Sequence, residues 1–350
     1  MSSSTKLKIG ILGFGVVGKK RLNCIKQSSF AEVVAVSDSN PKALDALVGD
    51  SIRVYSDYQN LIRSENLDAI FVCLTNNVNP YAVCEGLKKG MHVFCEKPPG
   101  RSLQDLRLIE EQFESLDIPR VLMFGFNHRY HKSVMETKNL IDAEVFGPIV
   151  TMRGVYGKSN LITFDQHDWR TNRQLAGGGV LLDQGIHLVD LLLFYHKLGF
   201  DEVKSFVDNS FWKYDVEDNV FALLRNSKNN VVASICSSAT QWSHQFHLEI
   251  GMERGAITLN GLLTGSKSYG EETLKIVSAE LGNSSGMPEW TLKKFNTDPS
   301  WALEVGEFLA AISEERVPRS GGLQEAIDTM SLVEQIYRSD KNWEKRFLHE

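Results

Sequence analysis

The sequence predicts an α/β protein with two domains: a doubly wound parallel sheet, then an α+β domain with a mostly antiparallel sheet. The first observation is the length, because 350 residues at roughly 150 per domain amount to about two domains. The second is a regular alternation of short β-rich runs and helical periodicity up to about residue 126. The third is a succession of strand-like runs between Val203 and Lys294. We therefore place the domains at residues 1–126 and 127–350.

The first domain alternates apolar strands with amphipathic helices, a pattern that indicates a parallel sheet with helices on both faces. Pro41 at a helix start, Ser102 as a helix cap and Gly90 after a helix end mark the boundaries. The predicted strands are Leu7–Leu12, Glu32–Val36, Asp68–Leu74, His92–Cys95 and Arg120–Gly125, and the predicted helices are Val17–Gln27, Pro41–Val48, Pro80–Lys89 and Ser102–Glu114.

The second domain begins with a helix and a strand, continues through a polar loop and an apolar helix, and then becomes rich in strands. Clusters of Asn, Gly and Ser separate these strands, which is typical of antiparallel connections. The predicted helices are Ser133–Asp142, Val180–Phe194, Trp301–Ile312 and Leu323–Tyr337, and the predicted strands are Ile149–Tyr156, Val203–Val207, Val220–Leu224, Val231–Cys236, Phe246–Gly251, Ala256–Leu259, Leu274–Val277 and Trp290–Lys294.

Composition and charge argue against several classes of protein. The chain has 38 basic and 44 acidic residues, a net charge of −6, which disfavours binding to nucleic acid or a membrane surface through bulk positive charge. The five cysteines lack the spacing of a disulfide framework or a zinc site, so a cytoplasmic location is expected. The polar start predicts no signal peptide, and no stretch is expected to span a membrane because none approaches roughly 20 apolar residues.

A glycine-rich turn follows the first predicted strand and opens the first helix. Its G-x-G-x-x-G pattern lets the backbone approach a pyrophosphate closely, and the helix N-terminus adds partial positive charge. The second strand ends at Asp38, where a carboxylate can bind ribose hydroxyls. This order of elements predicts a Rossmann dinucleotide-binding domain rather than an unrelated glycine turn. The turn residues expected to bind the cofactor are Gly13, Phe14, Gly15, Val17 and Gly18.

The carboxylate of Asp38 favours NAD, because it would repel the 2′-phosphate of NADP. Ser37, Ser39, Asn40 and Lys42 lie close to Asp38 in the sequence. These residues soften the preference, so NADP stays possible.

Two further segments carry residues suited to catalysis. One strand ends in Glu96-Lys97-Pro98, and ligands of parallel sheets bind beyond the carboxyl ends of the strands. A run of glycines, Gly177–Gly179, then leads into the apolar helix that carries Asp183 and His187. These two residues are four apart, so they are expected to share one helical face and one cleft.

Together these segments resemble the Gfo/Idh/MocA family, which includes glucose–fructose oxidoreductase and inositol dehydrogenase. The resemblance implies a Rossmann domain, a C-terminal α/β domain with an open sheet, and NAD(P)-dependent oxidation or reduction of a sugar, sugar-nucleotide or cyclitol. It also implies assembly into a homodimer or homotetramer through that sheet. Further positions carry the resemblance: Thr75, Asn76, Glu96, Lys97 and Asn127, expected at the cofactor, and Arg129, Trp169, Arg170, Asp183, Gln184 and His187, expected at the substrate.

The chain departs from the family pattern at two positions where many members have histidine. Arg21 stands three residues after the last glycine of the turn, and Asn79-Pro80 opens the helix after Thr75. Neither position is needed for hydride transfer, so they bear on subgroup and cofactor details. The segments Gln241–His244 and Gly261–Gly265 resemble relatives from surface-polysaccharide pathways, which favours a nucleotide-linked sugar as substrate.

The chemistry of alcohol oxidation requires these residue types. Hydride leaves the carbinol carbon as its hydroxyl proton departs, and a histidine is the natural base near neutral pH. We assign His187 as that base, Lys97 as proton relay and electrostatic support of the oxygen, and Asp183 as a group that holds the hydroxyl or tunes the pair. Substrate specificity is expected in the loops 157–176 and 264–286.

Each assignment has a structural alternative. The structural interpretation of Lys97 is a surface lysine, that of His187 is an interior histidine, and that of Asp183 is a helix cap. Arg129 and Arg170 read equally as ordinary ion-pair residues, and Trp169 as packing. His244 and His247 face opposite sides of a strand, so no metal site is predicted. Two other functions stay open, a non-catalytic NAD(P)-binding regulator and an NAD-dependent glycoside-cleaving enzyme.

Overall fold

The computed structural model describes residues 6–47, 49–159, 168–264, 268–278 and 288–347. The chain forms two compact units, one of Met1–Asn127 with Trp301–Ile327 and one of His128–Ser300 with Asp328–Glu350. The first boundary lies one residue from the predicted one. The prediction of a single division differs from the structure, because residues 301–327 return to the first unit.

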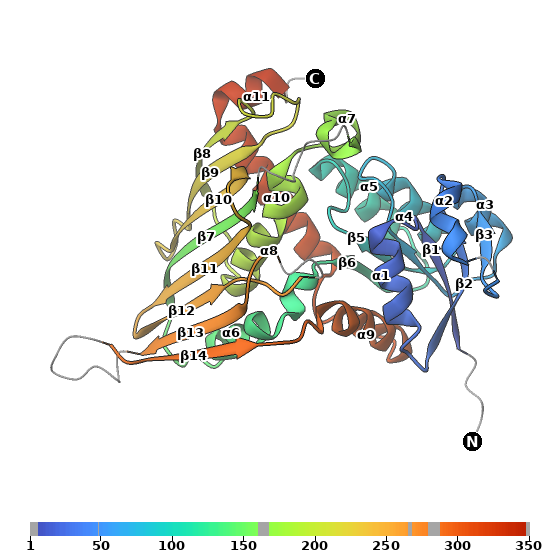
Figure 1. The fold of residues 1–350 in the computed structure, drawn as a ribbon, viewed down its shortest axis with the longest axis horizontal. Helices are drawn as coiled ribbons and strands as arrows, with labels where there is room; N and C mark the ends of the chain where they lie inside the picture. The colour runs from blue at the N-terminus through green and yellow to red at the C-terminus, as the bar shows by residue number, and fades with distance from the viewer. Residues whose placement is uncertain (1–5, 48, 160–167, 265–267, 279–287, 348–350) are drawn as a thin grey trace. The chain divides into compact units, whose positions relative to one another are not determined.

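The first unit is built on a six-stranded parallel sheet with the strand order β3-β2-β1-β4-β5-β6 (Figure 1). This order reverses between β1 and β4, which is the switch point at which doubly wound sheets bind ligands. The strands are β1 (Leu7–Leu12), β2 (Ala31–Ser37), β3 (Arg53–Tyr55), β4 (Ala69–Val72), β5 (His92–Glu96) and β6 (Leu122–Gly125), and the helices are α1 (Val16–Ile25), α2 (Pro41–Leu44), α3 (Tyr58–Ser64), α4 (Asn79–Lys88), α5 (Leu103–Glu114) and α9 (Ser300–Ser313).

Side-chain caps and aromatic packing explain the local structure of this unit. Ser102 accepts a hydrogen bond from the backbone N–H of Asp105 and so caps α5, as predicted. Helix α9 belongs to the first unit because Phe308 packs edge-on against Phe71 of β4 and Phe94 of β5, at ring distances of 5.2 and 5.6 Å. Strand β3 and helix α3 were not predicted. Both are short, and the residues around them give no clear periodicity.

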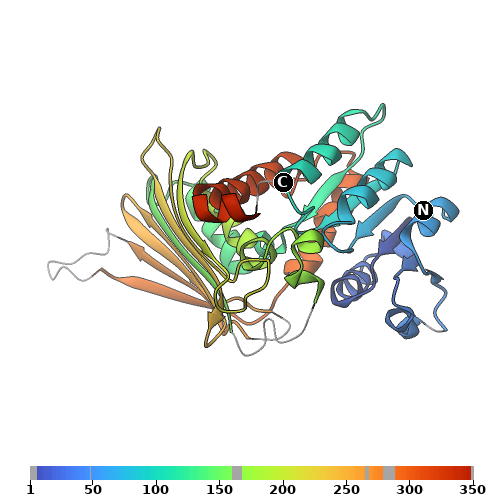
Figure 2. The same ribbon diagram turned by 90° about the horizontal axis from the view of Figure 1, so that it is seen from above.

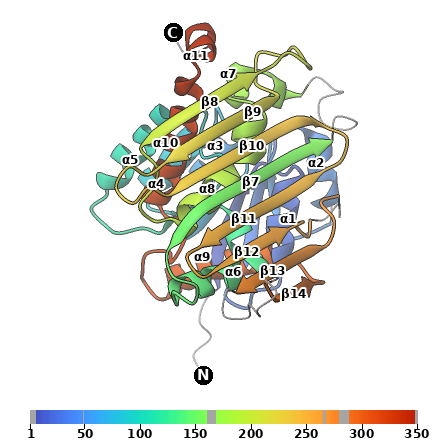
Figure 3. The ribbon, with the colours of Figure 1, turned by 90° about the vertical axis from the view of Figure 1, so that its left-hand side faces the viewer.

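The second unit is built on an eight-stranded mixed sheet with the order β14-β13-β12-β11-β7-β10-β9-β8 (Figure 3). Only β7 and β10 pair in parallel, and the other neighbours are antiparallel, which confirms the predicted sheet. Its strands are β7 (Ile149–Ser159), β8 (Glu202–Asp208), β9 (Asn219–Arg225), β10 (Val232–Gln241), β11 (Gln245–Met252), β12 (Gly255–Asn260), β13 (Glu272–Ser278) and β14 (Trp290–Phe295).

Helices of the second unit lie on one face of this sheet (Figures 2 and 3). Along β9 and β11 buried residues alternate with more exposed ones, as expected for a sheet with one covered face. Among the described residues, no helix covers the other face. The helices of this unit are α6 (Lys132–Asp142), α7 (Arg173–Ala176), α8 (Ile186–Tyr195), the end of α10 (Leu323–Ser339) and α11 (Lys341–Phe347), of which α7 and α11 were not predicted.

The apolar segment Arg173–Tyr195 corrects one expectation. It is 23 residues long with a mean hydropathy of 1.3, so it passes a test of length and composition for a membrane span. However, 72% of that window is buried inside the protein. The segment is therefore explained as part of the core of the second unit, where most of its apolar residues are buried.

Candidate functional site

The glycine turn of the first unit has the geometry of a phosphate-binding loop. Gly13 has φ +89°, and a Cβ there would collide with the carbonyl of Cys73. A Cβ on Gly18 would collide with the carbonyl of Gly13, so these two glycines allow helix α1 to pack closely on the strands. A Cβ on Gly15, by contrast, would meet no atom within 4 Å. Gly15 therefore borders open space at the N-terminus of α1, where an anion binds favourably.

Asp38 lies directly beside this turn. Its carboxylate accepts hydrogen bonds from the backbone N–H of Phe14 at 2.7 Å and of Asn40 at 2.8 Å. The carboxylate is thus held at the carboxyl end of β2 while the residue stays partly exposed. The described residues fit a dinucleotide: the turn would hold the pyrophosphate, and Asp38 a ribose hydroxyl.

The turn after β4 is tied to the Glu-Lys-Pro segment by Asn79. The side-chain oxygen of Asn79 accepts a hydrogen bond from the backbone N–H of Leu74, and its amide group donates to the carbonyl of Pro98 at 3.3 Å. Thr75 donates its hydroxyl proton to Asn77, and Asn76 is buried. Asn79, a departure from the family pattern, therefore connects two loops at the cofactor edge of the sheet.

Glu96 ends strand β5 and pairs with Arg21, and Lys97 follows directly after the strand. The guanidinium of Arg21 donates from Nε to Glu96 at 2.6 Å and from Nη2 to Glu304 of α9 at 2.6 Å. Glu96 was expected at the cofactor, and its carboxylate pairs with this buried arginine. Lys97 follows as a half-buried residue with a cis peptide bond to Pro98. It belongs to the first unit, whereas Asp183 and His187 belong to the second.

A buried glutamate anchors the helix that carries Asp183 and His187. Glu217 accepts hydrogen bonds from the backbone N–H groups of Gly179 at 2.7 Å and Leu181 at 2.9 Å, and from the hydroxyl of Tyr337 at 2.6 Å. A Cβ on Gly179 would collide with the backbone of Glu217. Burial raises the pKa of Glu217, although its hydrogen bonds from Tyr337 and Gly179 oppose that rise. The glycines thus serve close packing, and Glu217 rather than Asp183 satisfies the N–H groups at the start of the helix.

The helix start is a π-helical turn, Leu181–Gly185, followed by α8. Such turns occur frequently at functional sites. The side chain of Asp183 within it is 26% exposed and accepts a hydrogen bond from Lys158 of β7 at 2.8 Å. Arg170 lies 3.8 Å from the same carboxylate. Lys158 was not predicted, because no local motif distinguishes a lysine near the end of a strand.

His187 stacks on a second histidine, His128, to which no role was assigned from the sequence. The rings of His128 and His187 lie 3.7 Å apart at an angle of 10°. The Nε2 atom of His128 also hydrogen-bonds the hydroxyl of Tyr156 at 2.9 Å. Burial keeps the pKa of Tyr156 well above its ordinary value, so this phenol stays protonated. His128 therefore fixes the plane of the His187 ring.

Gln184 is the second residue of this turn with a defined partner. Tyr269 donates its hydroxyl proton to the Gln184 side chain at 2.6 Å, and its ring lies 5.3 Å from that of Tyr156. His244 packs edge-on against Tyr269. Tyr156, Tyr269 and His244 thus form a chain of ring contacts next to Gln184, and they come from segments far apart in the sequence, which gives no local signal.

Arg129 was expected either to contact substrate or to form an ordinary ion pair, and the structure shows an ion pair. Its guanidinium is buried and forms a two-point ion pair with Asp190 of α8, with the Nε atom 2.9 Å from Oδ2. A guanidinium held in this way joins α8 to the segment before α6. The substrate contact expected of Arg129 therefore has no support from its surroundings.

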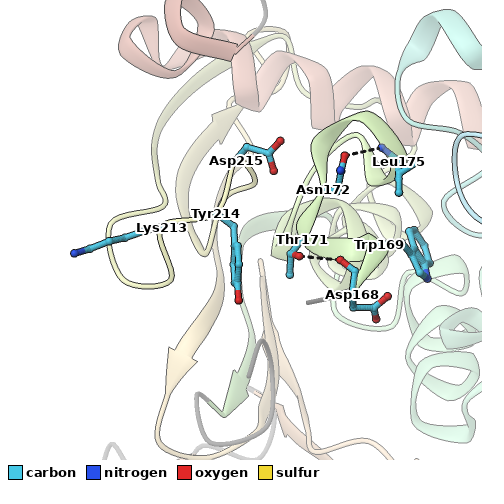
Figure 4. A pocket seen from close by; sticks show the side chains of 8 residues that line it. All are labelled: Asp168, Trp169, Thr171, Asn172, Leu175, Lys213, Tyr214 and Asp215. Atoms are coloured by element: carbon cyan, nitrogen blue, oxygen red, sulfur yellow. Dashed lines mark hydrogen bonds between the residues drawn. The ribbon is translucent and has the colours of Figure 1, made fainter. Parts of the chain in front are cut away.

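Trp169 and Arg170 lie in a short 3₁₀ turn beside a shallow pocket of about 510 Å³ (Figure 4). Arg170 stacks on the Trp169 ring at 4.5 Å and pairs with Asp168 at 2.7 Å. Trp169 lines the pocket, but Asp183 and His187 do not. The other lining residues are Asp168, Thr171, Asn172, Leu175, Lys213, Tyr214 and Asp215. Much of the two loops in which specificity was expected, 160–167, 265–267 and 279–287, lies outside the described residues.

The pair His244 and His247 has separate partners. His244 contacts Tyr269, and His247 lies 3.4 Å from the Asn260 side chain. In the part of the chain that the structure describes, no group of three or more His, Cys, Asp or Glu side chains lies close enough together to hold a metal ion.

Two family models match the chain. One, described as oxidoreductase family, NAD-binding Rossmann fold, matches residues 7–118, and one described as the GFO/IDH/MocA C-terminal domain matches residues 134–258. The chain belongs to the Gfo/Idh/MocA family. The predicted family, fold class and NAD-binding Rossmann domain are thereby confirmed.

Individual relatives agree with this assignment. A D-glucoside 3-dehydrogenase of Escherichia coli (strain K12) is 29% identical over 245 residues, which are 63% of this chain and 67% of the relative. An inositol 2-dehydrogenase/D-chiro-inositol 3-dehydrogenase of Lacticaseibacillus casei is 25% identical over 264 residues, 72% of each protein. A levoglucosan dehydrogenase in complex with NADH and levoglucosan has the same fold, with a TM-score of 0.84 at 19% identity over 97% of this chain and 98% of that one.

This Gfo/Idh/MocA protein is therefore an oxidoreductase with an NAD-binding Rossmann fold.

Proposed function

We propose that this Gfo/Idh/MocA protein oxidises a ring hydroxyl of a hexopyranoside or cyclitol, with His187 as the base and Lys97 as the group that stabilises the substrate oxygen. The proposal rests on the way in which the neighbouring residues hold the His187 ring. Its ring stacks on His128 at 3.7 Å, on a helix whose start is bound by buried Glu217. A side chain held so firmly suits a group that must meet a substrate hydroxyl in one orientation.

Each residue has a defined task in the reaction. His187 takes the hydroxyl proton while a C–H bond of the same carbon breaks and a carbonyl forms. The coenzyme, when bound, accepts the hydride. Lys97, at the carboxyl end of β5, donates a hydrogen bond to the oxygen and stabilises the negative charge that develops there. Asp183, paired with Lys158, accepts a hydrogen bond from a neighbouring substrate hydroxyl.

The substrate class follows from the charges beside Asp183. The two described cations near its carboxylate, Lys158 and Arg170, each have a carboxylate partner within 2.8 Å. Such neutralised pairs suit a polyol, whose hydroxyls both donate and accept hydrogen bonds. The names of the relatives, a D-glucoside 3-dehydrogenase and an inositol 2-dehydrogenase, support the same class. The role in surface-polysaccharide synthesis stays a prediction.

The catalytic assignment is tested with His187→Ala and Lys97→Ala. Each variant should lower kcat by at least about 100-fold, the contribution of a positioned general acid–base group. Affinity for NADH, measured by fluorescence titration, should change little. His196→Ala is the matched control, because this buried histidine follows directly after α8 and has no assigned role. Unchanged turnover in both catalytic variants would refute the assignment.

A substrate screen tests the function itself. Methyl glucosides, levoglucosan, inositols and nucleotide-linked sugars are incubated with NAD or NADP, and absorbance of the reduced nicotinamide is followed. Stoichiometric reduction with a polyol supports the proposal. Glycoside cleavage without net reduction of the coenzyme would identify a glycoside-cleaving enzyme. Coenzyme binding without turnover of any compound in the screen would identify a non-catalytic regulator.

We also infer that the open face of the second sheet joins copies of this chain into a homodimer or homotetramer. Phe206, Phe221 and Leu223 are 80%, 54% and 59% exposed on β8 and β9, beside an apolar groove of about 450 Å³. Clustered exposed apolar side chains of this kind favour a protein partner. Light scattering should give a dimer or tetramer that Phe206→Glu dissociates, whereas a monomeric wild type at micromolar concentration would contradict the inference. We also propose a cytoplasmic location, because the number and spacing of the five cysteines differ from those of a disulfide framework.

A further inference from the structure

The shallow pocket beside Trp169 contains none of the residues with a proposed task in the reaction. Its volume of about 510 Å³ is within the range of sites for small molecules. Two segments far apart in the chain form it: the 3₁₀ turn Trp169–Thr171 with helix α7, and the loop between β8 and β9. All of its described lining residues belong to the second unit.

The walls of this pocket combine an aromatic ring with polar groups. Figure 4 shows the Tyr214 ring and the Asp215 carboxylate on one side, and Asp168, Thr171 and Asn172 on the other. An aromatic ring offers an apolar surface to C–H groups, whereas carboxylate, hydroxyl and amide groups form hydrogen bonds. A sugar ring has both kinds of surface, because one of its faces carries C–H groups and its rim carries hydroxyls.

The surrounding protein holds the two main groups of one wall in place. The half-buried Tyr214 ring packs against the core residues Val180 and Ala239. The carboxylate of Asp215 accepts a hydrogen bond from the backbone N–H of Arg173 at 3.1 Å, and the carbonyl of Asp215 accepts one from the Arg173 guanidinium at 2.8 Å. These contacts join the two segments of the pocket. The lining groups are therefore placed in advance, which lowers the entropic cost of binding a ligand.

The charges around the pocket already have neighbours in the protein. Asp168 pairs with Arg170 at 2.7 Å, and Asp215 lies against Arg173. Lys213 is the one cationic side chain among the described lining residues, and in Figure 4 it points away from the other labelled side chains. A phosphate site requires cations that converge on the ligand. The described lining therefore suits a neutral ligand rich in hydroxyls better than a nucleotide diphosphate.

Arg170 connects this pocket to the substrate site proposed at Asp183. Its Nη1 atom lies 2.7 Å from Oδ2 of Asp168, which lines the pocket, and its Nε atom lies 3.8 Å from Oδ1 of Asp183. One guanidinium group, which is shorter than a sugar ring, thus separates the edge of the pocket from Asp183. A glycoside whose reacting ring is held at Asp183 can therefore extend its next ring toward the pocket.

We propose that this pocket binds the second sugar ring of a glycoside whose first ring is oxidised beside Asp183 and His187. The inference rests on the proposed function and narrows its substrate to a disaccharide or a longer glycoside. The Tyr214 ring packs on the apolar face of the second sugar ring, and the carboxylates of Asp168 and Asp215 accept hydrogen bonds from its hydroxyls. Tyr214 is thus a specificity-determining residue of the protein.

The test compares dissociation constants of methyl glucoside and of glucose disaccharides with different linkages. Calorimetry measures them in the presence of NADH, which permits no oxidation. At least one disaccharide should bind about tenfold more tightly than methyl glucoside, the gain expected from one additional packed ring. Absence of any such gain in the wild type would overturn the proposal, and this comparison does not depend on the folding of a variant.

Tyr214→Leu tests the residue itself, because leucine keeps an apolar side chain on the core but removes the aromatic face. The disaccharide should then bind within twofold of methyl glucoside, and an undiminished gain would contradict the proposal. Phe211→Ala is the matched control: Phe211 is 54% exposed in the same loop and is not among the described lining residues, so the gain should stay.

Two further outcomes separate this inference from its alternatives. If uridine diphosphate glucose gained affinity through Tyr214 and no disaccharide did, the pocket would bind a nucleotide, against the proposal. Oxidation of methyl glucoside without a disaccharide gain would refute the second-ring site and leave the proposed reaction intact. A disaccharide gain without oxidation of any polyol would refute the proposed reaction and leave the binding of the second ring.

Discussion

The two glycine-rich turns of this protein look alike in sequence but serve opposite purposes. Each precedes a helix, and each is bound by a carboxylate from a distant segment: Asp38 accepts from Phe14 at 2.7 Å, and Glu217 accepts from Gly179 at 2.7 Å. Asp38 is partly exposed, whereas Glu217 is fully buried. The first turn is open toward a ligand, and the second is closed against protein.

The difference lies in what occupies the space beside the glycines. A Cβ on Gly15 of the first turn would meet nothing within 4 Å, whereas one on Gly178 or Gly179 would collide with Tyr337 or Glu217. Glycine in the first turn leaves room for a phosphate, and glycine in the second lets the helix with His187 approach its support. A run of glycines therefore indicates that something approaches the backbone closely. The neighbouring residues decide whether it is a ligand or another part of the protein.

The largest effect is expected for Gly179→Ala, which tests whether the second turn is closed. The new methyl group would force the backbone of Glu217 away, so the free energy of unfolding should fall by about 3 kcal/mol. Urea denaturation followed by circular dichroism measures this.

Gly15→Ala is the matched substitution in the first turn. It should change the free energy of unfolding by less than about 1 kcal/mol, while affinity for NAD falls because the methyl group enters the ligand space. Equal stability losses in the two variants would remove the distinction between the turns.

Asp38→Ala tests whether the carboxylate beside the first glycine turn also binds the coenzyme. Hydrogen bonds to a charged group contribute about 2 kcal/mol, so NAD should bind roughly 30-fold more weakly. NADP should lose less, because the carboxylate repels its 2′-phosphate. Asp50→Ala, which removes an exposed carboxylate paired with Lys26, serves as control. A larger loss for NADP than for NAD would overturn the coenzyme preference.

Tyr337→Phe tests the second carboxylate in the same way. It removes the hydroxyl that donates to Glu217 at 2.6 Å without leaving a large cavity. The free energy of unfolding should fall by about 1.5 kcal/mol, the contribution of one hydrogen bond to a charged group. Affinity for NAD should stay unchanged. Weaker NAD binding would show that the second turn also acts on the coenzyme.

The smallest effect concerns pH and a residue far from either turn. Burial lowers the pKa of His92, at the start of β5, to about 4, and the charge of Arg120 adds to this. An unfolded histidine titrates near pH 6.5. The folded state therefore resists a proton that the unfolded state accepts, so the stabilisation is present above pH 6.5 and is lost as pH falls toward 4.

His92→Gln should remove that loss. Between pH 7.5 and 5, the stability of the wild type relative to this variant should fall by about 1 kcal/mol, a value reduced for the partial exposure of the ring. Denaturation curves at both pH values measure it. If the wild type instead became more stable relative to His92→Gln at low pH, the lowered pKa of His92 would be contradicted.

Elements with strong local signals were predictable from the sequence. The strands β1 and β5, helix α5 with its Ser102 cap and most strands of the second sheet lie within a few residues of their predicted bounds. Strand β3 and helices α3, α7 and α11 were missed because each is short and depends on packing for its existence. The return of α9 to the first unit was missed because Phe308 finds its partners more than 200 residues away.

Local patterns were enough to predict the class of this protein: the glycine turn, Asp38, Glu-Lys-Pro and the Asp183–His187 helix can each be recognised along the chain. How these groups are supported became visible only in the folded chain. His128 on His187, Lys158 on Asp183, Glu217 on the helix start and Glu304 on Arg21 all join residues distant in the chain. The physical reason is that burial and pairing depend on which surfaces meet, and a linear pattern records periodicity but not the partner on the other side.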